Sequence, residues 1–157
     1  MFNFVILCGG LGKRFQKISQ KIPKILIEIK PGLPMLDWLL EYYLPPNSKV
    51  ILATGHLREL VKDFVSKKSY KNNIIFSHEE NKLGTGGAII KASRLIQANE
   101  FIAINGDTIQ ELKIEKFIKK SILKDGDLIN IGCTISDLSD SGKLLVDSEN
   151  FITSFTE

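Results

Sequence analysis

The most informative part of this sequence is a short apolar run, FNFVILC at residues 2–8, which leads directly into GGLG at residues 9–12. An apolar run of this length is typical of a strand that other elements cover on both faces. Glycines directly after such a strand let the backbone approach a ligand and direct N–H groups toward an anion. The stretch therefore predicts a buried parallel strand that ends at an anion-binding turn.

The same strand pattern recurs along the chain and alternates with amphipathic stretches. Strands are predicted at Asn3–Cys8, Lys49–Ala53, Asn73–Ser77, Glu100–Ile104 and Leu128–Thr134. Helices are predicted at Met35–Tyr43, His56–Lys67, Thr85–Ala98 and Ile114–Lys124. Strands that alternate with helices are joined by right-handed crossovers into a mostly parallel sheet. We therefore predict a doubly wound, Rossmann-like α/β fold with three layers, in which helices cover both faces of the sheet.

The C-terminal part reads differently. Lys143–Val146 and Phe151–Phe155 flank Asp147-Ser148-Glu149-Asn150, which predicts a β-hairpin. No linker-like stretch and no internal repeat interrupts the chain. We therefore expect residues 1–157 to form one domain, and the strand-like sequence at its end indicates that this domain is incomplete.

Composition is that of an ordinary globular protein, with 43% apolar and 25% charged residues. The net charge of +3 is too small to indicate a nucleic-acid partner. The apolar run at the N-terminus is too short for a membrane span and lacks the features of a signal peptide. We expect Cys8 and Cys133 to be buried, reduced thiols of a cytoplasmic protein, with a disulfide as the alternative. The two histidines and two cysteines lack the spacing of a zinc site.

In an open α/β sheet, ligands bind beyond the carboxyl ends of the strands. That rule selects four segments, which should meet in space: Gly9–Arg14, Thr54–His56, His78–Gly87 and Asn105–Thr108.

The first of these segments opens a strongly basic stretch. Between Gly9 and Lys24 there are five basic residues and no acidic one. A glycine turn followed by unbalanced positive charge suits a triphosphate, and the alternative is a tight turn with a solvated charged face. The third glycine of a dinucleotide-binding fingerprint is replaced by Phe15, and no Gly-Lys-Ser/Thr follows. These absences argue against a dehydrogenase and against a P-loop ATPase.

Two later segments carry further candidates. Thr85 can cap the helix that follows it, and Gly86 and Gly87 in its first turn would leave N–H groups open to a polar ligand. Asp107 comes just after a buried strand and Gly106, which suits a Mg²⁺ ligand. The alternatives are close helix–sheet packing for the glycines and a capped turn for Asp107.

Several motifs, in the same order and at similar spacing, resemble those of the sugar-phosphate nucleotidyltransferases. They are GGLGKR at 9–14, Pro23-Lys24, GLPMLDW at 32–38, LGTGGA at 83–88 and Gly106-Asp107. The residues of these motifs most resemble those of the guanylyltransferase branch that acts on heptose 1-phosphates. The resemblance implies a GT-A-like version of the α/β fold and Mg²⁺-dependent transfer of a nucleotidyl group from an NTP to a sugar 1-phosphate.

The resemblance also implies a role for each matching residue. Arg14 would bind the β- and γ-phosphates, Lys24 would lie between the α-phosphate and the sugar phosphate, and Asp107 would hold Mg²⁺. Glu79 and Gly84 would face the base. The other residues expected at the nucleotide are Leu7, Gly9, Gly10, Gly12, Lys13 and Thr85. The chemistry needs no protein nucleophile, since it needs only positioning and charge neutralisation.

The base is a separate expectation. A carboxylate only accepts hydrogen bonds, and guanine offers two adjacent N–H donors on its Watson–Crick edge. Glu79 therefore favours GTP, although uracil and thymine also present one ring N–H.

The chain departs from the family pattern at three points. Lys13 stands where a small hydroxyl residue is usual, and Ile25 follows Lys24 where a second proline is common. The family normally continues with a Glu-Lys-Pro motif, a sugar-binding half and a later metal-binding aspartate. We therefore expect these residues to be part of a longer reading frame.

Three other functions compete with that enzyme. The first is a non-catalytic module that binds a nucleotide or nucleotide sugar. A glycosyltransferase is disfavoured because Asn105-Gly106-Asp107 replaces the Asp-x-Asp pair. A molybdopterin nucleotidyltransferase is disfavoured by the LGTGGA segment. The sequence leaves open whether the protein forms a homo-oligomer.

Overall fold

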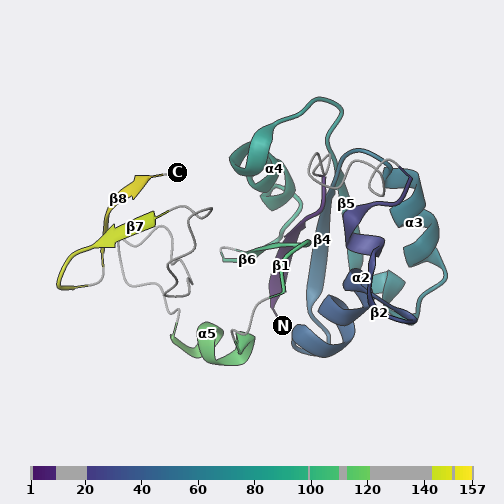
Figure 1. The fold of residues 1–157 in the computed structure, drawn as a ribbon, viewed down its shortest axis with the longest axis horizontal. Coiled ribbons are helices and arrows are strands. Elements are labelled where there is room, and N and C mark those ends of the chain that lie inside the picture. Colours follow the sequence, from purple (N-terminus) through teal and green to yellow (C-terminus); the bar gives the residue numbers. More distant parts are fainter. Residues whose placement is uncertain are drawn as a thin grey trace. The chain divides into compact units, whose positions relative to one another are not determined.

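The computed structural model describes residues 2–9, 21–98, 100–109, 113–120, 143–149 and 151–156. Its centre is a four-stranded sheet in the order β5-β4-β1-β6 (Figure 1). The strands are β1 (Asn3–Leu7), β4 (Lys49–Thr54), β5 (Ile74–His78) and β6 (Ile102–Asn105). All three strand pairs are parallel. The parallel sheet that the sequence predicted is confirmed, with strand boundaries that shift by one or two residues.

Strand β1 lies inside the sheet and pairs on both sides. Phe4 is opposite Val50 of β4 and Ile102 of β6. Phe4, Val5 and Ile6 are completely buried. The continuous apolar character of this strand is therefore explained, because alternate side chains enter two different cores.

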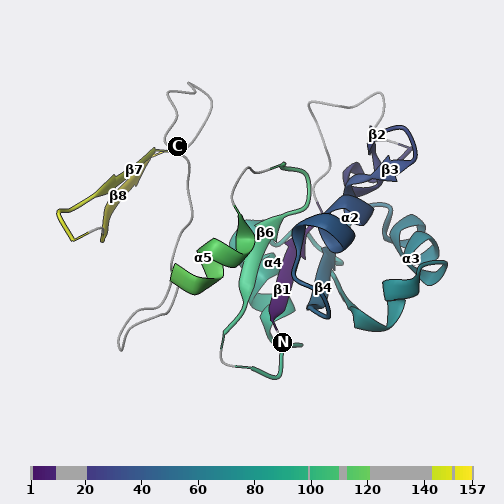
Figure 2. The same cartoon turned by 90° about the horizontal axis from the view of Figure 1, so that it is seen from below.

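Helices cover both faces of the sheet (Figures 1 and 2). One core contains Phe4, Ile6, Val50 and Leu52 with side chains of the helices α2 (Met35–Trp38), α3 (Arg58–Ser66) and α5 (Ile114–Lys120). The other core joins Val5, Ile51 and Ala53 to Ala88 and Ala92 of α4 (Gly84–Ser93). The three-layer α/β/α arrangement is confirmed.

The helix predicted over Met35–Tyr43 is present as two consecutive segments of different helix type. Its first turn is α2, and it continues as a π-helical turn over Leu39–Tyr43. Trp38 and Tyr43 stack with their ring centroids 5.2 Å apart. Trp38 packs against the first core.

A short irregular region before α2 was not predicted. It contains a 3₁₀ turn (Lys24–Leu26) and the antiparallel strands β2 (Glu28–Lys30) and β3 (Leu33–Pro34). Gly32 turns the chain between these strands with φ of 76°, a conformation that favours glycine. Strands of two or three residues are too short to show a period of two, so no sequence pattern predicts them.

Helix α3 begins at Arg58, later than the predicted start at His56. Leu57 directly before it has φ of 60°, in the left-handed region.

Asn47 has the same φ in the turn that leads into β4, where Ser48 N–H donates to Pro45 O at 3.3 Å. A type II turn typically has a proline as its first central residue and a positive φ at its second, which is the position of Asn47 here. A second 3₁₀ turn (Ser69–Asn73) connects α3 to β5.

The contacts within the chain divide it into two compact units, Met1–Lys120 and Ser121–Glu157. The second unit contains a hairpin of β7 (Lys143–Val146) and β8 (Ile152–Thr156). The hairpin predicted from the sequence is therefore confirmed. The strand predicted over Leu128–Thr134, with Cys133, lies outside the described residues. The expectation of a single domain stays a prediction.

Within the described parts of the chain, no helix combines the length and the apolar character that a bilayer crossing requires.

Candidate functional site

The functional site is expected at the edge of the sheet where the four parallel strands end. Backbone hydrogen bonds continue past the last strand residues and fix the segments that follow. Cys8 N–H donates to Ala53 O, Glu79 N–H to Thr54 O, and Gly106 N–H to Leu7 O, at 3.0, 2.8 and 2.9 Å. The segments after β1, β5 and β6 therefore have defined positions at one edge. The convergence that the sequence predicted for these segments is observed.

Lys24 and Asp107 meet at this edge, although they are far apart in the sequence. Lys24 Nζ donates to Asp107 Oδ2 at 2.9 Å. Their side chains are 26% and 43% exposed, so both remain accessible to a ligand. The hydroxyl of Thr108 donates to the other carboxylate oxygen, Oδ1, at 3.3 Å. A cation and a carboxylate thus lie side by side at the end of β6.

Gly106 allows this close approach. A Cβ atom at Gly106 would lie 2.9 Å from Ile25 Cδ1, Ile6 Cγ2 and Leu7 O. The backbone there packs directly against the residue that follows Lys24. A small pocket of about 20 Å³ lies between the segments, enough for roughly one water-sized group. It is lined by Leu7, Cys8, Lys24, Ile25, Gly106 and Asp107.

Glu79 extends toward the end of β1. One of its oxygens, Oε1, lies 3.1 Å from the position that a Cβ at Gly9 would take. The other, Oε2, accepts a hydrogen bond from Leu83 N–H at 3.0 Å. A Cβ at Gly55 would lie 3.0 Å from Gly9 O, so the segments after β1 and β4 also touch. Glu79, Gly9 and Gly55 therefore form one packed group, and the sequence did not single out Gly55.

Cys8 lies between these two groups and is chemically inert. Burial raises the pKa of its thiol to about 12, and the nearby Glu79 carboxylate adds to the shift. The thiol donates to Ala53 O at 3.2 Å. A thiol that keeps its proton is a poor nucleophile, so Cys8 fills space and supplies a hydrogen bond.

Thr85 does not cap α4, which corrects that prediction. The helix begins at Gly84, Leu83 occupies the capping position, and no side chain caps it. Gly84 has φ of 73°, which glycine reaches at no steric cost. Thr85 is an exposed residue of the first turn, beside Gly84 and Gly86, which are also exposed.

Four of the expected nucleotide-binding residues, Gly10, Gly12, Lys13 and Arg14, lie outside the described residues. The structure therefore describes Leu7, Gly9, Lys24, Glu79, Gly84, Thr85 and Asp107 of the predicted set.

Two buried polar atoms lie at the first residues of two of the predicted ligand-binding segments. Thr54 and His78 are opposite each other at the ends of β4 and β5. Thr54 Oγ1 and His78 Nδ1 are buried and have no hydrogen-bond partner within the part of the chain that the structure describes. A hydroxyl residue at a strand end gives no distinctive sequence signal.

The donor set at Asp107 fits Mg²⁺ but not a metal held by protein alone. No group of three or more His, Cys, Asp and Glu side chains is placed to hold an ion among the described residues. Mg²⁺ is typically bound by one or two carboxylates together with waters and substrate phosphates. A single exposed carboxylate next to a cationic edge fits that pattern.

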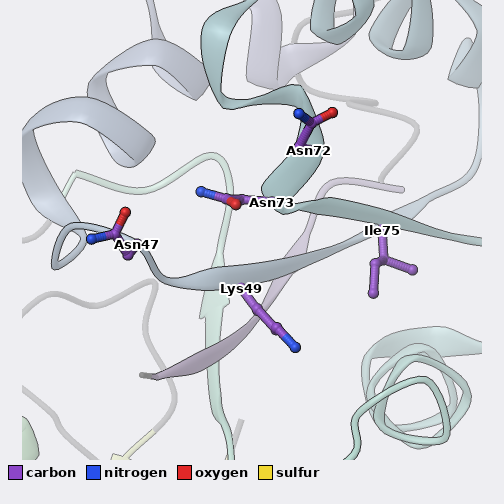
Figure 3. A pocket seen from close by; sticks show the side chains of 5 residues that line it. All are labelled: Asn47, Lys49, Asn72, Asn73 and Ile75. Carbon is purple, nitrogen blue, oxygen red and sulfur yellow. The ribbon is translucent and has the colours of Figure 1, made fainter.

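A larger hollow of about 470 Å³ lies at the opposite, amino-terminal ends of β4 and β5. Asn47, Lys49, Asn72, Asn73 and Ile75 line it (Figure 3). No carboxylate is among these residues. The candidate site is therefore identified by its chemistry at the carboxyl edge and not by the size of a cavity.

Comparison with known proteins gives the family. A family model described as nucleotidyl transferase matches residues 3–157. A curated protein from Aneurinibacillus thermoaerophilus, named D-glycero-alpha-D-manno-heptose 1-phosphate guanylyltransferase, is 35% identical over 126 residues, which cover 79% of this chain and 54% of that protein. A protein of the same name from Campylobacter jejuni subsp. jejuni serotype O:2 is 32% identical over 154 residues, covering 98% and 67%. The chain thus spans about half to two-thirds of these relatives' length.

Two solved structures are similar to this chain. HddC from Yersinia pseudotuberculosis, in a complex with GMP-PN, is similar with a TM-score of 0.80 and 38% identity, covering 100% of this chain and 69% of that chain. A UDP-glucose pyrophosphorylase complexed with UDP-glucose has a TM-score of 0.60 and 19% identity over 76% of this chain and 54% of that chain. The second likeness concerns the fold alone.

Proposed function

The chain belongs to the nucleotidyl transferase family, and from this premise we propose that it transfers a nucleotidyl group from an NTP to a sugar 1-phosphate. A phosphate oxygen of the sugar 1-phosphate attacks the α-phosphorus of the NTP. The bond from that phosphorus to the oxygen of the β-phosphate breaks, and pyrophosphate leaves with the electron pair. No protein group is bonded to the substrate at any stage.

The observation that carries the proposal is the contact between Lys24 and Asp107 at the end of β1, next to Leu7 and Cys8. Two polyanions must be brought together in this reaction, and negative charge has to be neutralised while they react. Lys24 would lie between the two reacting phosphates and stabilise that charge. Arg14 would bind the β- and γ-phosphates. Gly9, Gly10 and Gly12 would approach the phosphates with their backbone N–H groups.

Asp107 is proposed to hold Mg²⁺, which supplies positive charge to the phosphates when it is bound. Its exposed carboxylate is the hard oxygen donor that Mg²⁺ prefers. Leu7, Lys13 and Thr85 complete the proposed nucleotide contacts.

The test is the turnover of two variants. Loss of one preorganised charge contact typically costs about 3–4 kcal/mol in the transition state, or roughly 10²–10³ in rate. Lys24→Ala and Asp107→Asn are each expected to lower pyrophosphate release by that factor and to leave the circular dichroism spectrum unchanged. Lys21→Ala, which removes an exposed positive charge from the same basic stretch, is the matched control. Normal turnover by either site variant would remove that residue from the mechanism.

The proposed nucleotide is GTP. Glu79 supports this choice because its carboxylate can accept both N–H groups on the guanine edge. Two relatives named guanylyltransferase and the HddC complex with GMP-PN also support it. Gly84 would lie beside the base. Thermal shifts with GTP, UTP, CTP and dTTP in the presence of Mg²⁺ should be largest for GTP, and Glu79→Gln should reduce that preference. Equal shifts for the four nucleotides would contradict the choice of GTP.

The proposed acceptor is a heptose 1-phosphate, for which both curated relatives are named. The proposed place of the reaction is the cytoplasm, where nucleotide substrates are made. A pyrophosphate-release assay with several sugar 1-phosphates tests the acceptor directly.

The second candidate is a nucleotide-binding module without catalysis, which the packed group of Gly9, Gly55 and Glu79 would serve equally well. Binding of GTP and Mg²⁺ with no turnover for any sugar 1-phosphate would favour the module.

A further inference from the structure

Helix α2 contains a buried charge that the proposed reaction does not use. Asp37 is only 5% exposed and lies in the first turn of the helix. A buried carboxylate must be paired, because losing its hydration is costly. Asp37 Oδ2 accepts a hydrogen bond from Lys68 Nζ at 2.5 Å, and Oδ1 accepts one from the Tyr70 hydroxyl at 2.6 Å. Both oxygens are therefore satisfied by charge-assisted hydrogen bonds.

Both partners of Asp37 come from the segment between α3 and β5. Lys68 follows α3, and Tyr70 lies in the 3₁₀ turn before β5. Lys68 Nζ also lies 4.4 Å from the centre of the Phe64 ring, over its face. The bonds of Asp37 to Lys68 and Tyr70 therefore attach α2 to a segment that is more than thirty residues away in the sequence.

Helix α2 in turn holds the turn that begins with Lys24. Met35 N–H at the start of α2 donates to Ile27 O at 3.0 Å. Ile25 and Leu36 are fully buried in the same core. On its other side Ile25 packs against Gly106, directly before Asp107. The turn Lys24–Leu26 is thus held between α2 and the end of β6.

We propose that Asp37 is a positioning residue: its bonds to Lys68 and Tyr70 fix α2, and α2 holds Lys24 against Asp107. The inference rests on the proposed function, because Lys24 is there the group between the reacting phosphates. A displacement of about 1 Å at such a group can lower the rate by roughly 10²-fold, even when its cause is distant from the chemistry.

The test uses Asp37→Asn, which keeps the shape of the side chain but replaces one accepting oxygen by an NH₂ group that cannot pair with Lys68. Ile51→Ala is the matched control, because Ile51 is buried on the opposite face of the sheet and its truncation destabilises the fold without touching the network. Tyr70→Phe removes a single hydroxyl and serves as the second variant if Asp37→Asn does not fold.

The first measurement is hydrogen exchange in the ligand-free chain. The amides of Leu26 and Ile27 donate within the turn to Pro23 O and Lys24 O. Asp37→Asn should increase their exchange rates about tenfold or more, because the turn loses the support of α2. Tyr70→Phe should give a smaller increase. Ile51→Ala should increase these exchange rates only as far as its loss of overall stability accounts for. Unchanged exchange in both network variants would overturn the proposal, whether or not the chain is active.

The second measurement separates binding from turnover. Asp37→Asn should lower kcat roughly 10- to 100-fold while the Kd for the nucleotide changes by less than about threefold. Fast exchange with an unchanged kcat would overturn the positioning role. If the unsubstituted chain shows no turnover, the proposed function fails, and the exchange measurement alone then decides whether Asp37 positions the turn.

Discussion

The ion pair of Lys24 and Asp107 contributes little to folding, which is why its location is informative. The two side chains are partly exposed, and exposed pairs typically stabilise a protein by only about 0–1 kcal/mol. The burial of Ile25 against Gly106 already joins these two segments, so the partly exposed pair beside them fits a function at the edge of the sheet.

Asp107→Asn should therefore change the free energy of unfolding of the ligand-free chain by less than about 1 kcal/mol. Urea denaturation followed by circular dichroism measures this change. A loss well above that value would mean that Asp107 has a structural role, and a drop in turnover of this variant would then need another explanation.

Gly106 is expected to matter for both stability and position. An alanine there would place its Cβ 2.9 Å from Ile25 Cδ1, Ile6 Cγ2 and Leu7 O. One of these atoms belongs to the backbone of the central strand and cannot move away easily. Gly106→Ala should cost about 1–3 kcal/mol, the usual range for overpacking a buried site. Urea denaturation would show this loss, and wild-type stability of the variant would contradict the packing.

At the residue scale, the sequence predicted which side chains meet but not how they are held. The strand-end rule placed Asp107 at the carboxyl edge of the sheet, whereas Lys24 was placed near it by the resemblance to the nucleotidyltransferases. The contact of Glu79 with Gly9 could not, because it depends on how far a side chain reaches across β4. Thr85 was wrongly placed as a cap because Gly84, with its positive φ, occupies the first position of the helix.

At the scale of elements, helix α4 combines close packing with a weak start. Gly86 and Gly87 lie in its first turn and differ in their surroundings. A Cβ at Gly86 would meet nothing within 4 Å, whereas one at Gly87 would lie 2.8 Å from Leu83 Cβ. An alanine at Gly86 would therefore report helix propensity alone, whereas an alanine at Gly87 would also report the steric contact with Leu83.

Gly86→Ala should raise the free energy of unfolding by up to about 1 kcal/mol, because alanine is the better helix former. Gly87→Ala should gain less or lose stability, because Leu83 has to move. Urea denaturation of the two variants side by side tests this difference, and equal gains would show that Leu83 adapts freely. If Gly86→Ala is more stable but binds GTP more weakly, its open N–H groups contact the nucleotide.

The elements that the sequence predicted well are those with long, regular patterns. Strands β1 and β4 and helix α5 begin at the expected residues. Helix α3 begins late because Leu57 adopts a left-handed conformation that no residue type there announces. The strands β2 and β3, which precede α2, are too short for any periodic signal.

At the scale of the whole molecule, the α/β fold was predictable from the alternation of strands and helices. What the pattern could not provide is which thiol and hydroxyl groups the fold removes from water. Cys8, Tyr43 and Tyr70 are such partly buried groups. Burial is the main cause that raises the pKa of each, with additional effects of Glu79, Glu115 and Asp37, respectively.

These shifts fix the sign of the alkaline response. The thiol of Cys8 ordinarily loses its proton near pH 9.0, but in the folded chain its pKa is about 12. Between those values the unfolded chain binds fewer protons than the folded chain, so the free energy of unfolding falls as pH rises. Each such group contributes a slope of about 1.4 kcal/mol per pH unit when it is fully within its window. The tyrosines act in the same direction from their ordinary pKa of 10.0 upward.

Stability should therefore begin to decrease near pH 9 in the wild-type chain and about one unit later in Cys8→Ala, in which only the tyrosine contributions remain. Urea denaturation at several pH values between 7.5 and 10.5 measures both curves. Cys8→Ala loses packing and the hydrogen bond to Ala53 O at every pH, so only the change of the difference with pH is diagnostic. Cys133 is present in both chains and does not affect that difference. Parallel curves would mean that the Cys8 thiol ionises as easily in the folded chain as in the unfolded one, contrary to the raised pKa that its surroundings give it.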